Sequence, residues 1–283
     1  MVHAHFIGLW GYVGVALKGE LHVPLVVTAH GGDAYSIPLM TGPRREIAEQ
    51  VVRSADRLIA VSKPIAENLA DLGASREKIR VLPNGYDGSV FFPASSRESR
   101  ALLGLPAEKK ILLVVANLVP QKGHEYLLRC LQMMDDRGDL VLVVVGGGPL
   151  EPVLKRLTLE LGLGSRVMFV GPKPHSEIPL WINACDLFVL PSVNEGSPTV
   201  IAEAMACGKP VVATKVGGIP DIVVVGRTGY LATAGDADEL SAVIKIALSV
   251  SWDPGEILDA ARGYSWAALA PKLVEIYREV API

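Results

Sequence analysis

VLPSVNEGSPTVIAEAMACG, residues 189–208, is the stretch around which the rest of the sequence is arranged. It opens with apolar residues that end a strand, turns through residues 191–196, and continues as a helix. Ser197 is a favourable N-cap, Pro198 at the first helical position gives up no hydrogen bond, and Gly208 closes the helix. A glycine-containing loop that leads from a strand into a helix presents unpaired backbone N–H groups and the positive end of the helix dipole. The stretch is therefore suited to bind an anion such as phosphate.

Two carboxylates flank this predicted anion site, Glu195 in the loop and Glu203 in the helix. A carboxylate repels a phosphate, whereas the hydroxyl groups of a sugar can donate hydrogen bonds to it. A phosphate on the helix N-terminus with a polyol on either side describes a nucleotide sugar. Each glutamate alone is equally well explained as a surface residue beside a helix cap. The pair, together with the Gly-Ser-Pro turn between them, favours a ligand site.

The pair lies within a longer pattern that resembles a known family. Residues 192–214 read S-x-x-E-G-x-P-x-x-x-x-E-A-M-A-x-G-x-P-V-V-A-T, which is similar to the retaining glycosyltransferases of family GT4. The resemblance implies the GT-B fold, an α/β architecture of two Rossmann-like doubly wound domains with parallel sheets. It also implies transfer of a sugar from a nucleoside-diphosphate sugar to a hydroxyl acceptor (a glycan, a lipid or a small molecule) with retention of configuration. Polysaccharide or glycolipid biosynthesis is the process that it suggests.

The composition suits a globular protein with one large core or two moderate ones, because half of the 283 residues are hydrophobic. A net charge of −3 gives no long-range attraction for nucleic acid, so a phosphate site has to be built locally. The cysteines, Cys130, Cys185 and Cys207, lie in apolar contexts without a C-x-x-C pair. They indicate buried free thiols and a reducing compartment.

Nothing at the N-terminus has the basic-then-apolar order of a signal peptide. No apolar run reaches the ~18 residues that a membrane-spanning helix needs. We expect a soluble cytoplasmic protein, and peripheral contact with the inner face of a membrane stays open.

The second half of the sequence alternates short apolar runs with helical stretches. Continuous apolar strands separated by helices predict a parallel sheet covered on both faces, which binds ligands at the carboxyl ends of its strands. The predicted strands are residues 111–116, 140–145, 167–170, 187–190 and 211–213. Each is followed by a loop rich in glycine or proline, at residues 117–123, 146–149, 171–175, 191–198 and 214–220. Five such loops on one edge predict a ligand crevice.

Lys122, in the first of these loops, offers a positive charge to a phosphate. Taken alone it is equally well explained as a solvated surface lysine. It lies in N-L-V-P-x-K-G, residues 117–123, which is similar to the family's phosphate-binding loop. Many relatives have arginine where Asn117 stands, so the resemblance implies that phosphate binding here depends more on Lys122, Gly123 and the helix N-terminus.

The N-terminal part contains a second candidate site residue, His30. A predicted strand at residues 25–28 ends in Ala-His-Gly-Gly-Asp, and the glycines allow a ligand to approach the backbone closely. A histidine in this place is also compatible with a core position. The segment from His5 to Asp33 resembles the GT4 pattern H-a-H…P-l-V-V-T-a-H-G-x-D, which implies that His30 faces the donor sugar. Helices are predicted at 44–54 and 64–72, a strand at 57–62, and a strand followed by a turn at 79–87.

Two short motifs invite a metal interpretation that we do not favour. His3-Ala-His5 places two imidazoles on one face of a strand, without further ligands at the spacing of a metal site. Asp236-Ala-Asp238 resembles the D-x-D motif of another glycosyltransferase fold, but acidic residues are expected where a helix begins. No metal site and no cofactor are predicted, the nucleotide sugar being a substrate.

The domain boundaries follow from composition and from the resemblance. Residues 1–93 are predicted to form a partial N-terminal acceptor-side domain, since family members have further strands and helices before the histidine motif. We therefore expect an N-terminally truncated sequence. The polar segment 93–104 is interpreted as a linker. Residues 94–265 are the predicted donor-binding domain, and 266–283 a C-terminal helix that packs back on the N-terminal domain.

The resemblance also assigns roles to the site residues. Glu203 holds the ribose hydroxyls, Glu195 contacts the donor sugar, and Lys122 stabilises the charge on the leaving phosphate. The segment from Gly196 to Thr199 binds the diphosphate through the backbone N–H groups of Gly196, Ser197 and Thr199, while Pro198 lies in the segment and has no N–H group to donate.

Two other functions stay open from the sequence alone. One is a non-catalytic fragment that binds a nucleotide sugar, and turnover of the donor would exclude it. The other is a GT-B nucleotide-sugar epimerase, which would release epimerised sugar without an acceptor.

Overall fold

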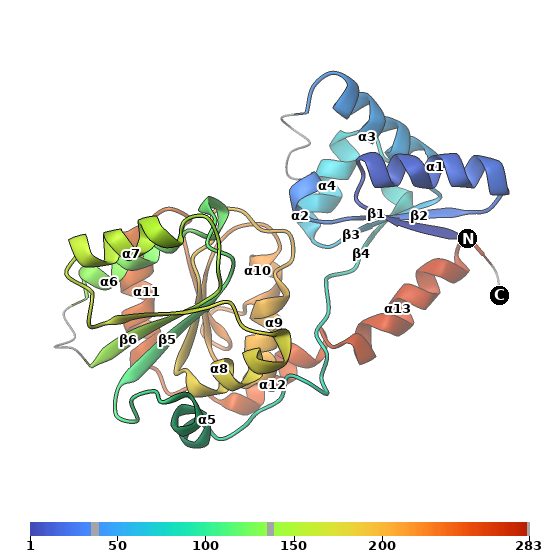
Figure 1. Cartoon of the computed structure of the whole chain (residues 1–283). Helices are drawn as coiled ribbons and strands as arrows, with labels where there is room; N and C mark the ends of the chain where they lie inside the picture. The colour runs from blue at the N-terminus through green and yellow to red at the C-terminus, as the bar shows by residue number, and fades with distance from the viewer. Residues whose placement is uncertain (35–39, 135–138, 282–283) are drawn as a thin grey trace. The chain divides into compact units, whose positions relative to one another are not determined.

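The computed structural model describes residues 1–34, 40–134 and 139–281. Their contacts group into two compact units, each with a sheet of its own (Figure 1). The first unit comprises Met1–Gly85, Glu195–Pro198 and Tyr264–Ile283, and the second comprises Tyr86–Asn194 and Thr199–Gly263. Each unit therefore combines segments that are distant in the sequence.

The first unit contains a parallel sheet of four strands in the order β1-β2-β3-β4. The strands are β1 (Val2–His5), β2 (Leu25–Ala29), β3 (Arg57–Ala60) and β4 (Ile79–Val81). Every residue of β2 is buried, as expected of an inner strand that has apolar residues on both faces. The helices of this unit are α1 (Leu9–Leu21), α2 (Gly31–Ala34), α3 (Pro43–Ser54), α4 (Lys63–Asp71), the 3-10 helix η2 (Arg76–Lys78) and α13 (Trp266–Arg278).

Both faces of the first sheet are covered. Val27 and Leu58 belong to a cluster with buried residues of α3 and α4. The neighbouring residues Val26 and Ile59 point to the opposite face, because side chains alternate along a strand. There they pack with Leu269 and Ile276 of α13. The C-terminal helix thus completes the core that the N-terminal strands begin.

The second unit contains six parallel strands in the order β10-β9-β8-β5-β6-β7, which confirms the predicted doubly wound sheet. The strands are β5 (Lys110–Val115), β6 (Leu140–Val145), β7 (Val167–Gly171), β8 (Leu187–Leu190), β9 (Val211–Thr214) and β10 (Gly229–Ala232). The helices are α5 (Ser96–Leu103), η3 (Pro120–Lys122), α6 (His124–Gln132), α7 (Glu151–Glu160), η4 (His175–Glu177), α8 (Ile178–Ala184), α9 (Thr199–Ala206), α10 (Ile219–Ile222), α11 (Ala237–Ser249) and α12 (Pro254–Arg262).

The apolar runs of the sequence form the core of the second unit. All residues of β6 are buried, and in α9 every residue from Ile201 to Ala206 is buried. One cluster of buried residues joins β5 and β6 to the inner faces of α6 and α11, for example through Leu127, Leu131 and Ile244. A sheet covered in this way leaves its loop-bearing edges as the places where a ligand can reach the backbone.

Residues 93–104 were predicted to be a polar linker. This prediction is wrong in part, because the segment contains the helix α5. The side chain of Ser95 caps this helix by accepting a hydrogen bond from the backbone N–H of Glu98. Arg100 is buried and binds the carboxylate of Asp186 at 2.7 Å and the carbonyl oxygen of Ala184 at 2.9 Å. A serine- and arginine-rich segment looked solvated in the sequence, whereas its arginine is buried and bonds to Ala184 and Asp186, which are distant in the chain.

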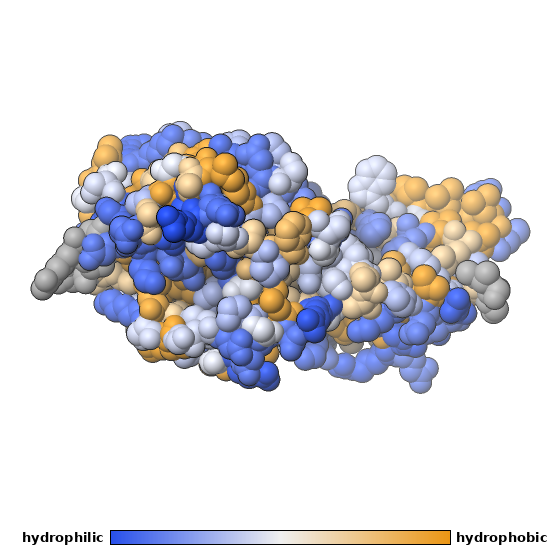
Figure 2. Space-filling view, turned by 90° about the horizontal axis from the view of Figure 1, so that it is seen from below, coloured by the Kyte–Doolittle hydropathy of each residue, from blue (hydrophilic) through white to orange (hydrophobic). Residues whose placement is uncertain are grey.

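The surface carries apolar and polar residues in separate small patches on the face shown in Figure 2. Among the residues that the structure describes, no helix is both long enough and apolar enough to cross a membrane.

Replacing Arg100 by alanine should lower the free energy of unfolding by about 3 kcal/mol, because Asp186 and buried carbonyl oxygens would lose their partner. Urea unfolding followed by circular dichroism measures the loss. Arg97→Ala is the matched control, since Arg97 is exposed on the same helix and its loss should stay within about 0.5 kcal/mol. Equal losses in the two variants would show that Arg100 does not anchor α5.

Candidate functional site

The strand order of the second unit reverses direction between β5 and β8. From β5 the chain proceeds outward to β6 and β7, and it then returns to the other side of β5 as β8. Doubly wound sheets bind ligands at the carboxyl ends of the two strands where the order reverses. The loops that follow β5 and β8 are therefore the expected site, and they contain most of the predicted site residues.

These two loops are in direct contact. The backbone N–H of Val193 donates to the carbonyl oxygen of Gln121 at 2.9 Å. Gly123 has a positive φ of 64°, and a Cβ atom on it would lie 2.0 Å from the carbonyl oxygen of Pro191. Only glycine fits a backbone that is both left-handed and this close to its neighbour. The predicted site residue Gly123 thus allows the two loops to meet.

A third loop, after β6, joins the same edge. Leu118 donates its backbone N–H to the carbonyl oxygen of Gly147 at 2.9 Å, and the backbone N–H of Gly146 donates to the carbonyl oxygen of Gly171 at 3.0 Å. A Cβ atom on Gly146 would lie 1.9 Å from the carbonyl oxygen of Ala116. After β9, the hydroxyl of Thr214 donates to the carbonyl oxygen of Ser192. The glycine- and proline-rich loops are therefore bonded to one another along one edge, as predicted.

The helix that was predicted to begin at Pro198 begins one residue later, since α9 runs from Thr199. Pro198 therefore precedes the helix, and Ser197 lies two residues before it. A difference of one residue is within the range over which assignments of a helix end vary. Because α9 starts directly after this loop, its first backbone N–H groups lack partners within the helix.

Glu203 lies in α9 and is 7% exposed. Burial raises the pKa of its carboxyl group, while hydrogen bonds from His175 and Thr199 act against that increase. The Nε2 atom of His175 lies 3.4 Å from Oε1 of Glu203. His175 stands in the loop after β7, and its ring also meets the edge of Phe91 with centroids 5.1 Å apart. The carboxylate is thus held at the loop edge by neighbours that can also contact a ligand.

The sequence pointed to the loop of His175 but assigned the residue no role. The signal that could have found it is its position shortly after a strand of the parallel sheet, as the first residue of η4. Its contact with Glu203 joins residues that lie 28 positions apart, which a motif search within one loop cannot detect.

The other predicted residues of the second unit lie in the loop after β5. Asn117 is exposed, and Lys122 is half-buried at the end of η3. Glu195, Gly196, Ser197 and Pro198 follow β8 in the sequence, and by their contacts they group with the first unit. Glu195 is 9% exposed, so it is a nearly buried carboxylate rather than a solvated surface residue.

His30 lies in the first unit, between the end of β2 and α2. Its backbone N–H donates to Oδ1 of Asp33 at 3.0 Å, and its Nε2 atom lies 2.9 Å from Nδ1 of His5. Burial, and then the neighbouring His5, lower the pKa of His30. The second carboxyl oxygen of Asp33 accepts the backbone N–H of Ile7 at 2.9 Å. Hydrogen bonds therefore hold both the backbone and the ring of His30.

The two motifs for which a metal was not favoured have structural partners. Asp236 caps α11 by accepting the backbone N–H of Glu239 at 2.8 Å, which confirms the helix start. His3 and His5 bond to side chains of neighbouring elements. Within residues 1–34, 40–134 and 139–281, histidine, cysteine, aspartate and glutamate side chains form no group of three or more that could hold a metal ion.

The three cysteines are buried and unpaired, as predicted, and burial raises the pKa of each thiol to about 12. Thiols with such pKa values stay protonated at neutral pH and are poor nucleophiles.

Gly123→Ala should destabilise the second unit more than Gly162→Ala. Gly162 has a similar φ of 71° but open space around its Cβ position, so its replacement tests the backbone strain alone, at about 1 kcal/mol. Gly123→Ala adds the clash with Pro191 and should cost roughly 1–3 kcal/mol more in unfolding free energy. Denaturant unfolding of both variants compares them, and equal losses would mean that the loops after β5 and β8 separate easily.

Comparison with known proteins places the chain. The family described as "Glycosyl transferases group 1" matches residues 95–258, and the family "Glycosyltransferase Family 4" matches residues 1–89. A D-inositol 3-phosphate glycosyltransferase of Thermobispora bispora is 34% identical over an alignment of 302 positions, which covers 99% of this chain and 70% of that protein. The enzyme of the same name from Mycobacterium bovis is 33% identical, and the chain covers 61% of its length.

A solved structure agrees with these sequence matches. Anabaena Alr3699/HepE in complex with UDP superposes with a TM-score of 0.86 at 26% identity, covering 95% of this chain and 76% of that one. The two parallel sheets with alternating helices, one in each unit, match this GT-B architecture. The chain therefore belongs to the group 1 glycosyltransferases, with the GT-B fold and a family 4 N-terminal region.

Proposed function

We propose that the chain transfers a sugar from a nucleoside-diphosphate sugar to a hydroxyl acceptor with retention of configuration. The observation that carries this proposal is the edge at β5 and β8, where a lysine, a glycine-dependent loop contact and the buried carboxylate of Glu203 lie at the reversal point of the sheet. Such an edge offers backbone N–H groups and a positive charge to a diphosphate, and a carboxylate to hydroxyl groups.

In this proposal the diphosphate binds between the loop after β5 and the start of α9. Lys122 supplies the positive charge, and the backbone N–H groups of Gly196, Ser197 and Thr199 donate to phosphate oxygens. Asn117 and Gly123 bind through the same loop, with Asn117 as an uncharged donor. The positive charge and the fixed N–H groups stabilise the negative charge that grows on the leaving phosphate.

The two glutamates bind the hydroxyl-bearing parts of the donor. Glu203 accepts hydrogen bonds from the ribose, and Glu195 and His30 contact the donor sugar. Both glutamates are at most 9% exposed, so their carboxylates are poorly hydrated, and the hydroxyl groups of a ligand can add hydrogen bonds to them.

Retention is proposed to occur by attack on the same face of the sugar from which the diphosphate leaves. The bond between the anomeric carbon and the phosphate oxygen breaks, and its electron pair goes to the diphosphate. The acceptor oxygen forms the new bond to the anomeric carbon, and its proton passes to the leaving phosphate oxygen. No step forms a glycosyl-enzyme bond, so an adduct on Glu195 or His30 would contradict this route.

The substrates that we propose are taken from those named for the relatives. Alr3699/HepE has been crystallised with UDP and with UDP-glucose, which supports a uridine-containing donor. The name D-inositol 3-phosphate glycosyltransferase makes a phosphorylated polyol a candidate acceptor. We also propose residues 94–265 as the donor-binding domain, with residues 1–93 and the helix of 266–283 on the acceptor side, in a cytoplasmic protein that can contact a membrane peripherally.

Lys122→Ala should weaken UDP binding and lower kcat by 10²–10³-fold, roughly the effect of removing one preorganised group that stabilises a transition-state charge. A thermal-shift screen of UDP-, GDP- and ADP-sugars first selects the donor. Calorimetric titration and initial rates then compare the variant with Lys245→Ala, which removes an exposed lysine from α11. Unchanged rates and affinity in Lys122→Ala would identify Lys122 as a surface charge without a catalytic role.

Glu203→Gln should weaken UDP binding and yet stabilise the fold at pH 8. Because burial raises the pKa of Glu203, its ionised form costs stability that is regained as the pH falls through that pKa. The gain in Tm of Glu203→Gln should thus be larger at pH 8 than at pH 5. The variant should also lose discrimination between UDP and its 2′,3′-dideoxy analogue. Retained discrimination would show that Glu203 does not hold the ribose.

A further inference from the structure

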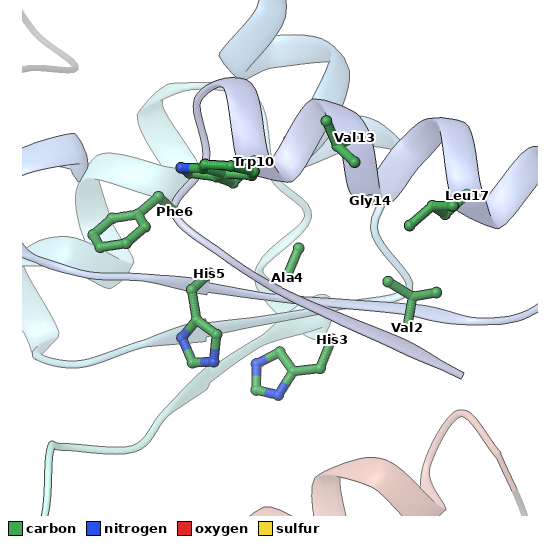
Figure 3. A pocket seen from close by; sticks show the side chains of 9 residues that line it. All are labelled: Val2, His3, Ala4, His5, Phe6, Trp10, Val13, Gly14 and Leu17. Carbon is green, nitrogen blue, oxygen red and sulfur yellow. The ribbon is translucent and has the colours of Figure 1, made fainter.

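Three imidazole rings form a row in the first unit. A contact with the donor sugar was predicted for His30, at one end of the row, and no role was predicted for the other two rings. His3 and His5 are alternate residues of β1, and Figure 3 shows both side chains on the side of the strand away from α1. The ring centroids of His3 and His5 lie 4.6 Å apart, and those of His5 and His30 lie 5.2 Å apart. The row therefore leads from His3, through His5, to His30.

The first ring of the row is held at both nitrogens. Nδ1 of His3 lies 2.7 Å from the hydroxyl of Tyr277, and Nε2 lies 2.7 Å from the hydroxyl of Thr28. Burial, followed by the nearby His5 and His30, lowers the pKa of His3 to about 4. His3 is therefore neutral at neutral pH, and a neutral ring fixed at both ends is a rigid surface for His5 to stack on.

The second ring connects to the third by a hydrogen bond. Nδ1 of His5 lies 2.9 Å from Nε2 of His30, which requires one proton between the two nitrogens. If both nitrogens carried protons, the contact would be repulsive. The bond therefore fixes the rotation of the His30 ring and couples its tautomer to that of His5, because one of the two facing nitrogens donates and the other accepts.

We propose that His5 is a positioning residue for His30, holding its ring in one orientation and one protonation state for contact with the donor sugar. This inference rests on the proposed role of His30. The titratable groups around the pair are His3 of β1, Asp33 of α2 and Tyr277 of α13, and of these Asp33 bonds to the backbone of His30 rather than to its ring. His5 is thus the ring partner through which the protonation state of His30 is set.

Two amide variants of His5 test the proposal. Asparagine places its amide near the position of Nδ1, whereas glutamine extends it toward the position of Nε2. His5→Asn should keep the bond to His30 and retain kcat. His5→Gln should lose the bond and lower kcat by on the order of tenfold or more, with a smaller effect on the KM for the donor. His5→Phe keeps a ring for stacking without the bond, and it should behave like His5→Gln.

A pH profile separates positioning from general support of the fold. His5 contributes to the lowered pKa of His30, so its replacement by phenylalanine should move the acidic limb of kcat to higher pH. The ring nitrogen chemical shifts of His30 should also change between the wild type and His5→Phe, as measured by NMR without any substrate. Tm values of the variants show whether the fold is intact.

His30→Ala distinguishes the two proposals. Full activity of His30→Ala would overturn the role of His30 and with it the proposal for His5. A different result would overturn only the positioning role of His5. In that case His30→Ala loses activity, while His5→Gln and His5→Phe keep the kcat, the pH profile and the His30 chemical shifts of the wild type. If His5→Phe does not fold, the comparison of His5→Asn with His5→Gln decides in the same way.

Discussion

The close approach of the loops after β5 and β8 is the constraint on which the candidate site depends. Gly123 and Pro191 can lie this close only because Gly123 has no side chain, and the backbone of Val193 bonds to Gln121 across the same junction. Because the strand order reverses here, the chain leaves β5 toward β6 and leaves β8 toward β9, in opposite directions along the sheet. The groups of the second unit that we propose to bind phosphate are placed by backbone packing, and the proposal needs no large net positive charge on the chain.

The sequence predicted the parts that depend on local pattern. The apolar runs marked most strands of the two sheets but not β10, and the pair Glu195 and Glu203 marked the loop and helix of the candidate site. Contacts between distant segments could not be predicted in this way. Arg100 has partners beyond residue 180, and His175 meets Glu203 from another loop, so neither environment appears in a local pattern. The polar segment around Arg100 was consequently taken for a linker.

Ligand binding and stability place opposite demands on the buried ionisable groups. Burial penalises the charge of Glu203, and burial together with the neighbouring His5 lowers the pKa of His3 and of His30. Groups of this kind are costly for the folded chain and useful for orienting hydroxyl and phosphate groups. The two units divide this arrangement, with the histidine row on the first sheet and Lys122 and Glu203 at the edge of the second.

Nucleotide binding at the β5 and β8 edge is tested most directly by titrating the ¹⁵N-labelled chain with UDP and following its backbone amide resonances. If UDP binds at this edge, chemical shift changes should be concentrated in residues 117–123 and 196–203. Uridine, which lacks the diphosphate, should bind more weakly than magnesium-free UDP. Changes confined to other segments, or no binding of UDP, GDP or ADP at millimolar concentration, would contradict it.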